Sequence, residues 1–73
     1  MTAYNGHRSW NAWNVSLWIN NDEGMYRRAV DLARRFGIVR AAKMLFEELE
    51  GQKTPDGARY TSSAVRSALR EII

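Results

Sequence analysis

The strongest constraint on the fold is an apolar stripe that repeats at helical spacing in the middle of the chain. Its members follow the i, i+4, i+7, i+8, i+11 spacing of one buried helix face, and they are Met25, Tyr26, Ala29, Leu32, Ala33 and Phe36. The opposite face is polar and holds Arg27, Arg28, Asp31, Arg34 and Arg35. Asn21 or Asp22 is a suitable N-cap, and Asp22 with Glu23 suits the positive end of a helix dipole. The pattern predicts an amphipathic helix that ends near Phe36.

A glycine on either side marks the next helix. Gly37 follows the predicted helix at the position of a left-handed C-cap, so that helix is expected to end there. A new helix is expected from about Ile38 to Glu50. Gly51 closes that helix. Its inner face is expected to consist of Ile38, Ala41, Ala42, Leu45 and Leu49.

The last third of the chain reads as a loop followed by a final helix. Residues 52–60 contain a Thr-Pro-Asp-Gly turn at their centre, which is typical of a loop. Thr61 or Ser62 is then a suitable N-cap. The apolar residues of the final helix again repeat at helical spacing, and they are Val65, Ala68, Leu69, Ile72 and Ile73.

The period of the first segment, residues 10–21, is ambiguous. Alternate residues are apolar as in a strand, but Trp10, Trp13, Leu17 and Trp18 suit a helix that begins after Ser9 as N-cap. We favour the helix. Its three tryptophans are expected to form much of the core, with Asn14 satisfying backbone groups around them. The alternative is that one tryptophan is left exposed for a protein partner.

These patterns predict an all-α fold, a compact single domain of three to four short helices over residues 1–73. The chain has 73 residues and no cysteine, so packing alone must stabilise it. Its apolar runs are far shorter than the ~20 residues that span a bilayer, and residues 1–20 lack the features of a signal peptide. We therefore expect no membrane association and a cytoplasmic location.

Residues suited to catalysis do not cluster in the sequence. His7 is the only histidine, has no acidic residue nearby, and is expected to be an exposed turn residue. Glu47, Glu48 and Glu50 fan around a helix and are better explained as a solvated face. The sequence therefore predicts no enzyme, no catalytic residue, no cofactor and no metal site.

The basic charge of the chain points to an acidic partner. The net charge is +3, and residues 1–40 hold six arginines against three acidic residues. This balance argues against an acidic mimic of DNA and permits a nucleic acid or an acidic protein surface as partner. Our first choice for the partner surface is the polar face of the helix that ends near Phe36, with an exposed tyrosine as anchor. Its residues are Arg27, Arg28, Arg34 and Arg35, with Tyr26 or Tyr60 as the anchor. The alternative is that these arginines are merely solvated, with Asp31 pairing Arg27 or Arg35.

Residues 31–46 resemble a DNA-binding helix-turn-helix unit. Phe36, Gly37 and Ile38 would form the turn. The segment departs from such units at Lys43, where an aliphatic residue is usually buried, and at Val39, which replaces the polar cap of the recognition helix. Acidic residues at the end of that helix would also repel phosphates. A small DNA-binding regulator that uses residues 31–50 is therefore the second hypothesis, with dimerisation expected.

A pattern of aromatic and amide residues resembles a family of small proteins carried by phages and other bacterial mobile elements. The residues that carry it are Tyr4-Asn5-Gly6, Trp10, Trp13-Asn14-Val15, Leu17-Trp18-Ile19, Asn21-Asp22-Glu23-Gly24, Thr54-Pro55-Asp56-Gly57 and Tyr60. The chain is similar to anti-CRISPR inhibitors of type I systems, subtype I-C among them. The resemblance implies a bacterial cytoplasm and a binding function, and it contains no catalytic motif.

The leading hypothesis that follows is a stoichiometric inhibitor. It would bind a subunit of a host RNA-guided type I CRISPR-Cas surveillance complex and hinder binding of the target DNA, with nucleic acid as a further partner of the basic face. A third hypothesis is a structural phage protein that folds on assembly, for which the apolar C-terminal residues Ile72 and Ile73 are the hint.

Overall fold

Four helices make up most of the chain in a computed structural model that describes residues 9–72. Within these residues, the one element of β-structure is an isolated antiparallel bridge between Lys53 and Arg59. The all-α prediction is confirmed. The expectations for His7, residues 4–6 and Ile73 fall outside the described residues. The helices are α1 (Trp10–Asn21), α2 (Glu23–Phe36), α3 (Ile38–Leu49) and α4 (Ser62–Ile72).

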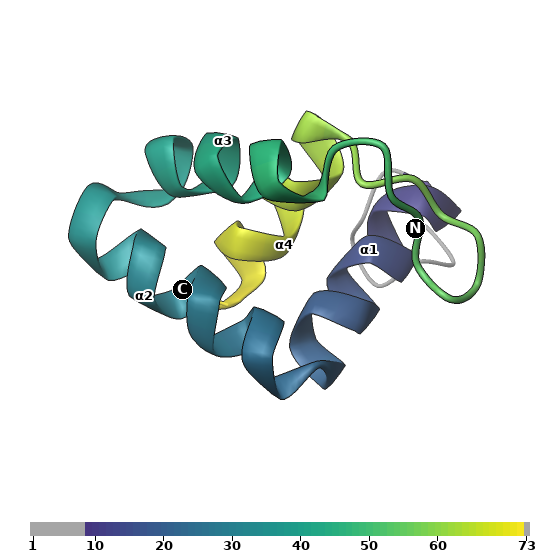
Figure 1. The fold of residues 1–73 in the computed structure, drawn as a ribbon, viewed down its shortest axis with the longest axis horizontal. Helices are drawn as coiled ribbons and strands as arrows, with labels where there is room; N and C mark the ends of the chain where they lie inside the picture. The colour runs from purple at the N-terminus through teal and green to yellow at the C-terminus, as the bar shows by residue number, and fades with distance from the viewer. Residues whose placement is uncertain (1–8, 73) are drawn as a thin grey trace.

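The helices α1, α2 and α3 are arranged around α4 (Figure 1). The helix α4 packs against both α1 and α3, whereas α2 packs mainly against α3 and contacts α1 through their shared corner at Asp22. The loop of residues 50–61 runs from the end of α3 past α1 before α4 begins. No helix in residues 9–72 combines the length and the apolar character needed to traverse a bilayer.

Side-chain caps begin three of the helices where the sequence predicts them. The Ser9 hydroxyl accepts a hydrogen bond from the Ala12 amide at 3.1 Å, and the Asp22 carboxylate accepts one from the Met25 amide at 2.9 Å. Thr61 Oγ1 likewise accepts from the backbone amide of residue 64 at 3.1 Å. Each cap satisfies an amide that has no partner within its helix, so the predicted starts of α1, α2 and α4 are confirmed.

The junction between α2 and α3 is a single glycine. Gly37 has φ 83° and ψ 165°. The positive φ is as expected, but this ψ lies outside the left-handed helical region, in a conformation open almost only to glycine. The predicted left-handed cap is therefore wrong in ψ, because the chain must turn into α3 directly after one residue.

We expect Gly37→Ala and Gly37→Asn each to lower the free energy of unfolding by about 1–3 kcal/mol. A Cβ at this position would meet nothing within 4 Å, so the loss would come from the backbone alone. Gly24→Ala, inside α2 and at ordinary contact distance from Asp22, is the control and should be neutral or stabilising. Urea denaturation followed by circular dichroism measures all three, and equal stabilities for the Gly37 and Gly24 variants would contradict the prediction.

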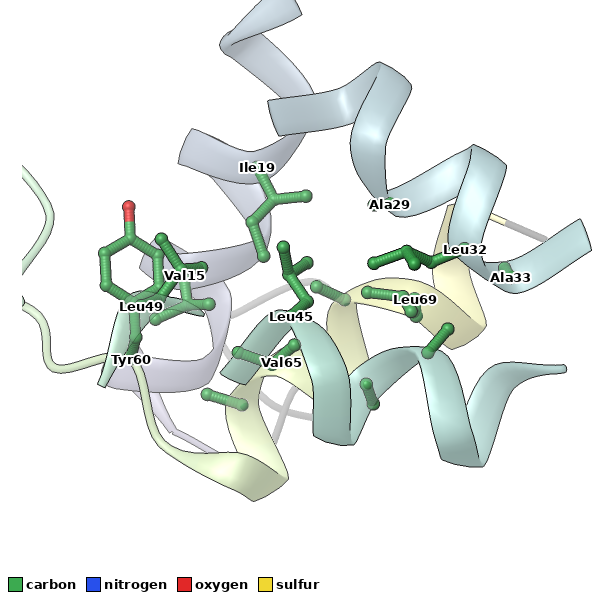
Figure 2. Close-up of a cluster of buried hydrophobic side chains, with 14 of the residues drawn as sticks. Val15, Ile19, Ala29, Leu32, Ala33, Leu45, Leu49, Tyr60, Val65 and Leu69 are labelled. Carbon is green, nitrogen blue, oxygen red and sulfur yellow. The ribbon is translucent and has the colours of Figure 1, made fainter. Parts of the chain in front are cut away.

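The core is mostly aliphatic and lies between α4 and the other three helices (Figure 2). The predicted inner faces of α3 and α4 are confirmed, since their central residues are buried and Ile38 and Ile72 are partly buried. The largest fully buried apolar side chains are Val15, Ile19, Leu45, Val65 and Leu69.

The tryptophans of α1 are not the core, so that prediction is wrong. The helix buries Val15 and Ile19, both fully, whereas Trp10 is 41% exposed and Trp13 and Trp18 are only partly buried. The short branched side chains belong to the core, and α1 packs against α4. The indoles lie at the margin of the core, where a ring can keep its N–H near a polar partner.

Candidate functional site

The predicted arginine surface of α2 is exposed but largely paired within the chain. Arg27 forms an ion pair with Glu23 at 2.5 Å, and Arg35 forms one with Asp31 at 3.1 Å. Arg28 forms a two-pronged pair with Glu48 of α3. The hydrogen bond from Arg28 lowers the pKa of the Glu48 carboxyl.

Arg34 is the exception among these four arginines, because no acidic side chain of residues 9–72 pairs with it. Exposed pairs are weak and can be exchanged for a partner's carboxylates. Nevertheless, α2 offers a mixed-charge surface on which only Arg34 of the four arginines is unpaired within residues 9–72, whereas the sequence suggests four available arginines.

The two candidate anchor tyrosines differ in exposure. Tyr26 is 39% exposed on α2 and remains available to a partner. Tyr60 is only 6% exposed and belongs to the core cluster, so its prediction as an exposed anchor is wrong (Figure 2). Burial raises the pKa of the Tyr60 hydroxyl. The ring is drawn inward because the loop that carries it is held against α1.

Amide and indole groups of α1 hold that loop. Asn11 exchanges two hydrogen bonds with the backbone of Arg59, each 2.9 Å long. Asn14 accepts a hydrogen bond from Thr54 Oγ1 at 2.6 Å and donates one to Asp56 at 2.9 Å. We call this set of contacts, completed by a 2.9 Å hydrogen bond from the Trp18 indole N–H to Asp56, the α1–loop latch.

The latch joins the two blocks of residues on which the expected resemblance to phage proteins rests. Asn14 is 1% exposed and Thr54 is 4% exposed, and Thr54 Oγ1 also accepts from the Ala58 amide at 3.0 Å. Asn14 thus satisfies loop side chains and not the backbone groups that the sequence predicts. Every buried side-chain nitrogen and oxygen in the described part of the chain has a hydrogen-bond partner. The latch is therefore structural, and it fixes where Lys53 and Arg59 lie.

The latch is expected to make the stability of the protein sensitive to acid. Hydrogen bonds from Asn14 and Trp18 lower the pKa of the Asp56 carboxyl. A lowered folded-state pKa gives stability that is complete above the unfolded value, near pH 4, and is lost as the pH falls through the folded value. We expect the free energy of unfolding to decrease below about pH 4, and Asp56→Asn to flatten this decrease because the amide oxygen still accepts both bonds without titrating.

Urea denaturation between pH 2 and pH 7 measures this acid slope. Glu47→Gln is the control, since Glu47 has no hydrogen-bond partner in residues 9–72. An Asp56→Asn slope equal to that of the parent would contradict the role of Asp56.

A shallow groove runs between α3 and α4 and continues to the loop. Its first part has a volume of about 380 Å³ and its second part about 370 Å³. The two parts share Phe46, Glu50 and Ser62, so they form one continuous surface. We call it the α3–α4 groove. Its other lining residues are Val39, Arg40, Lys43, Glu47 and Arg66 in the first part and Gly51, Gln52, Lys53, Arg59, Tyr60 and Thr61 in the second.

The α3–α4 groove gathers most of the unpaired basic side chains. Three of the ten Lys and Arg side chains in residues 9–72 pair with a carboxylate, and five of the other seven line this groove. These five are Arg40, Lys43, Lys53, Arg59 and Arg66, against two carboxylates, Glu47 and Glu50. Their excess of three positive charges equals the net charge of the whole chain.

Apolar side chains lie among these charges. Val39 is 64% exposed, and Phe46 is partly buried between the two parts of the groove. The Arg40 guanidinium stacks over the Phe36 ring, 5.2 Å from its centroid, which restrains the side chain. The groove therefore places Phe46 where its two parts meet, with Val39 and the five cations around it.

The sequence analysis did not predict this groove, although the sequence contains part of the pattern that forms it. Val39, Lys43, Phe46 and Glu50 follow the i, i+4, i+7, i+11 spacing of one helix face, and all line the groove. Lys53, Arg59 and Arg66 line the groove because of the latch and the packing of α4. These contacts join distant residues, so no local sequence pattern predicts them.

The helix-turn-helix hypothesis agrees with the positions of α2 and α3 but not with the turn between them. One residue, Gly37, joins α2 and α3, whereas such units use a turn of three or four residues. Lys43 is exposed, at the position where those units bury an aliphatic side chain. Val39 and Arg40 are exposed near the start of α3.

Within residues 9–72, the structure brings together no group of three or more His, Cys, Asp or Glu side chains that could hold a metal ion.

The profile of one protein family, described as a family of unknown function (DUF7249), matches residues 1–73. No curated protein and no solved structure shows significant similarity to the chain.

Proposed function

The chain belongs to this family of unknown function, and we propose that it is a non-enzymatic inhibitor that binds a host surveillance complex. The target would be a protein subunit of a type I CRISPR-Cas complex in the bacterial cytoplasm, and binding would hinder recognition of the target DNA. The observation that carries the binding role is the concentration of unpaired cations around an apolar centre in the α3–α4 groove. The choice of target rests on the resemblance to anti-CRISPR proteins of phages.

The composition of the groove favours a protein partner over a nucleic acid. Protein interfaces typically place aromatic and apolar anchors at their centre and charges at the rim. Here Phe46 is shared by both parts of the groove, and cations lie towards both ends. Glu47 and Glu50 line the same surface and would repel a phosphate backbone.

Inhibition by this route is stoichiometric. The complex must present acidic side chains to attract the groove, and surfaces near its DNA path are where an added 8.4 kDa protein would obstruct the duplex. Charge complementarity of this kind mainly raises the association rate and the specificity. Inhibition should therefore weaken as the salt concentration rises.

A titration of the protein into a type I surveillance complex with labelled target duplex tests the proposal. Fluorescence anisotropy follows the DNA, and the same duplex without the complex is the control series. We expect complex-dependent DNA binding to be lost near one equivalent of inhibitor, with no binding to free duplex. Unchanged DNA binding by the complex would contradict the proposal.

A DNA-binding regulator that uses α3 is the second candidate function. The exposed positions of Val39, Arg40 and Lys43 near the start of α3 favour it, since recognition helices contact bases with their N-terminal residues. It predicts binding to free duplex that weakens steeply with salt. Such binding in the control series, with the complex unaffected, would assign the protein to this function.

A further inference from the structure

The form of the α3–α4 groove specifies the kind of protein segment that it can hold. We infer that the groove receives an acidic amphipathic helix of the partner, with apolar side chains against Phe46 and Val39 and carboxylates towards both ends. This inference rests on the proposed protein-binding function of the same groove.

The shape of the groove suits a helix. It lies lengthwise between α3 and the start of α4, and its two parts join at Phe46. Residues 9–72 offer no sheet edge to which an extended peptide could add, because their one β-bridge is isolated. Helices bind such grooves through apolar residues at i, i+3, i+4 and i+7. Phe46, at the junction, is the contact for the central anchor.

The order of charges along the groove sets the order of charges on the occupant. Arg40, Lys43 and Arg66 lie in the first part, and Lys53 and Arg59 lie in the second. Both ends of the bound helix therefore face cations. Glu50 is shared by both parts and lies near the middle with Phe46, so a carboxylate at the centre of the occupant would be repelled. The expected occupant is acidic at its ends and apolar or basic at its centre.

A second copy of the chain fits this groove less well. Two such surfaces facing each other would bring together two groups of five cations with only two carboxylates each. Like charges juxtaposed across an interface disfavour association. An acidic partner instead neutralises the excess of positive charge.

Nuclear magnetic resonance with defined peptides tests the inference on the full chain. The probe is a capped 14-residue helical peptide with leucines at i, i+3, i+4 and i+7 and glutamates near both ends. We expect it to shift the backbone amides of residues 39–50, 53, 59 and 66 of the labelled protein. Replacing its leucines with alanine should weaken binding at least tenfold, and replacing its glutamates with lysine should abolish the shifts.

Matched variants of the protein locate the binding. Lys43→Glu should weaken peptide binding at least tenfold, whereas Arg34→Glu, the same charge change on α2, should leave it unchanged. Absence of shifts at millimolar peptide, or shifts confined to α2, would overturn the inference. If the chemical shifts of the groove residues change on dilution without peptide, the inference is also overturned, because a second copy of the chain then occupies the groove. If the peptide fails while the protein still inhibits the surveillance complex, only this inference fails; loss of inhibition itself contradicts the proposed function.

Discussion

Replacing Asn14 with leucine is expected to lower the free energy of unfolding by about 3 kcal/mol, because a buried hydrogen-bonded amide is lost. Asn14 is 1% exposed, and its side chain bonds both Thr54 and Asp56. The substitution leaves the Thr54 hydroxyl without its 2.6 Å acceptor and removes one of the two donors to Asp56. In a domain of this size the loss corresponds to a decrease of roughly 15 °C in Tm.

Urea and thermal unfolding followed by circular dichroism measure this effect. Asn20→Ala is the matched control, since Asn20 is an exposed amide of the same helix that bonds only within α1. Its effect should stay below about 1 kcal/mol, as for most surface substitutions. Equal effects of the two substitutions would show that the α1–loop latch does not stabilise the fold.

Reversing Lys43 and Arg66 together, as Lys43→Glu with Arg66→Glu, is expected to weaken binding to the surveillance complex about hundredfold. Each reversal replaces an attraction with a repulsion, and a loss of about 1.4 kcal/mol at each site gives tenfold. Both side chains are exposed and line the groove, so the fold should be retained. Competition in the anisotropy assay measures the affinity.

The pair Arg34→Glu with Arg35→Glu is the control for this experiment. It changes the net charge by the same amount but lies on α2, outside the groove. We expect it to retain inhibition, with unchanged helical circular dichroism for both double variants. If the α2 pair abolishes inhibition and the groove pair does not, the binding surface is the arginine face that the sequence alone suggests.

The helices could be predicted from sequence because their determinants are local. Capping side chains such as Ser9 and Asp22 bond amides only three residues away. The apolar stripes of α3 and α4 likewise depend on spacing within one helix. The ψ angle of Gly37 cannot be predicted from sequence, because it depends on how α2 and α3 pack against each other.

The candidate site could not be predicted from sequence, because it depends on pairing between distant residues. The arginines of α2 are the densest basic cluster in the sequence, yet Glu48 of α3, 20 residues away, pairs with Arg28. Lys53 and Arg59 join the groove because Asn11 and Asn14 hold their loop through contacts that span 40 to 48 positions of sequence. The same contacts hold the loop that carries the buried Tyr60 against α1.

Chemical footprinting of lysines locates the binding surface in the assembled complex. The chain has two lysines, Lys43 and Lys53, and both line the α3–α4 groove. Acetylation by an amine-reactive ester, quantified by mass spectrometry, compares their reaction rates in the free protein and in the inhibited surveillance complex. We expect both lysines to be protected, while Arg34 keeps its free-protein rate towards an arginine reagent. Full reactivity of both lysines in a complex that remains inhibited would show that the groove is not the binding surface.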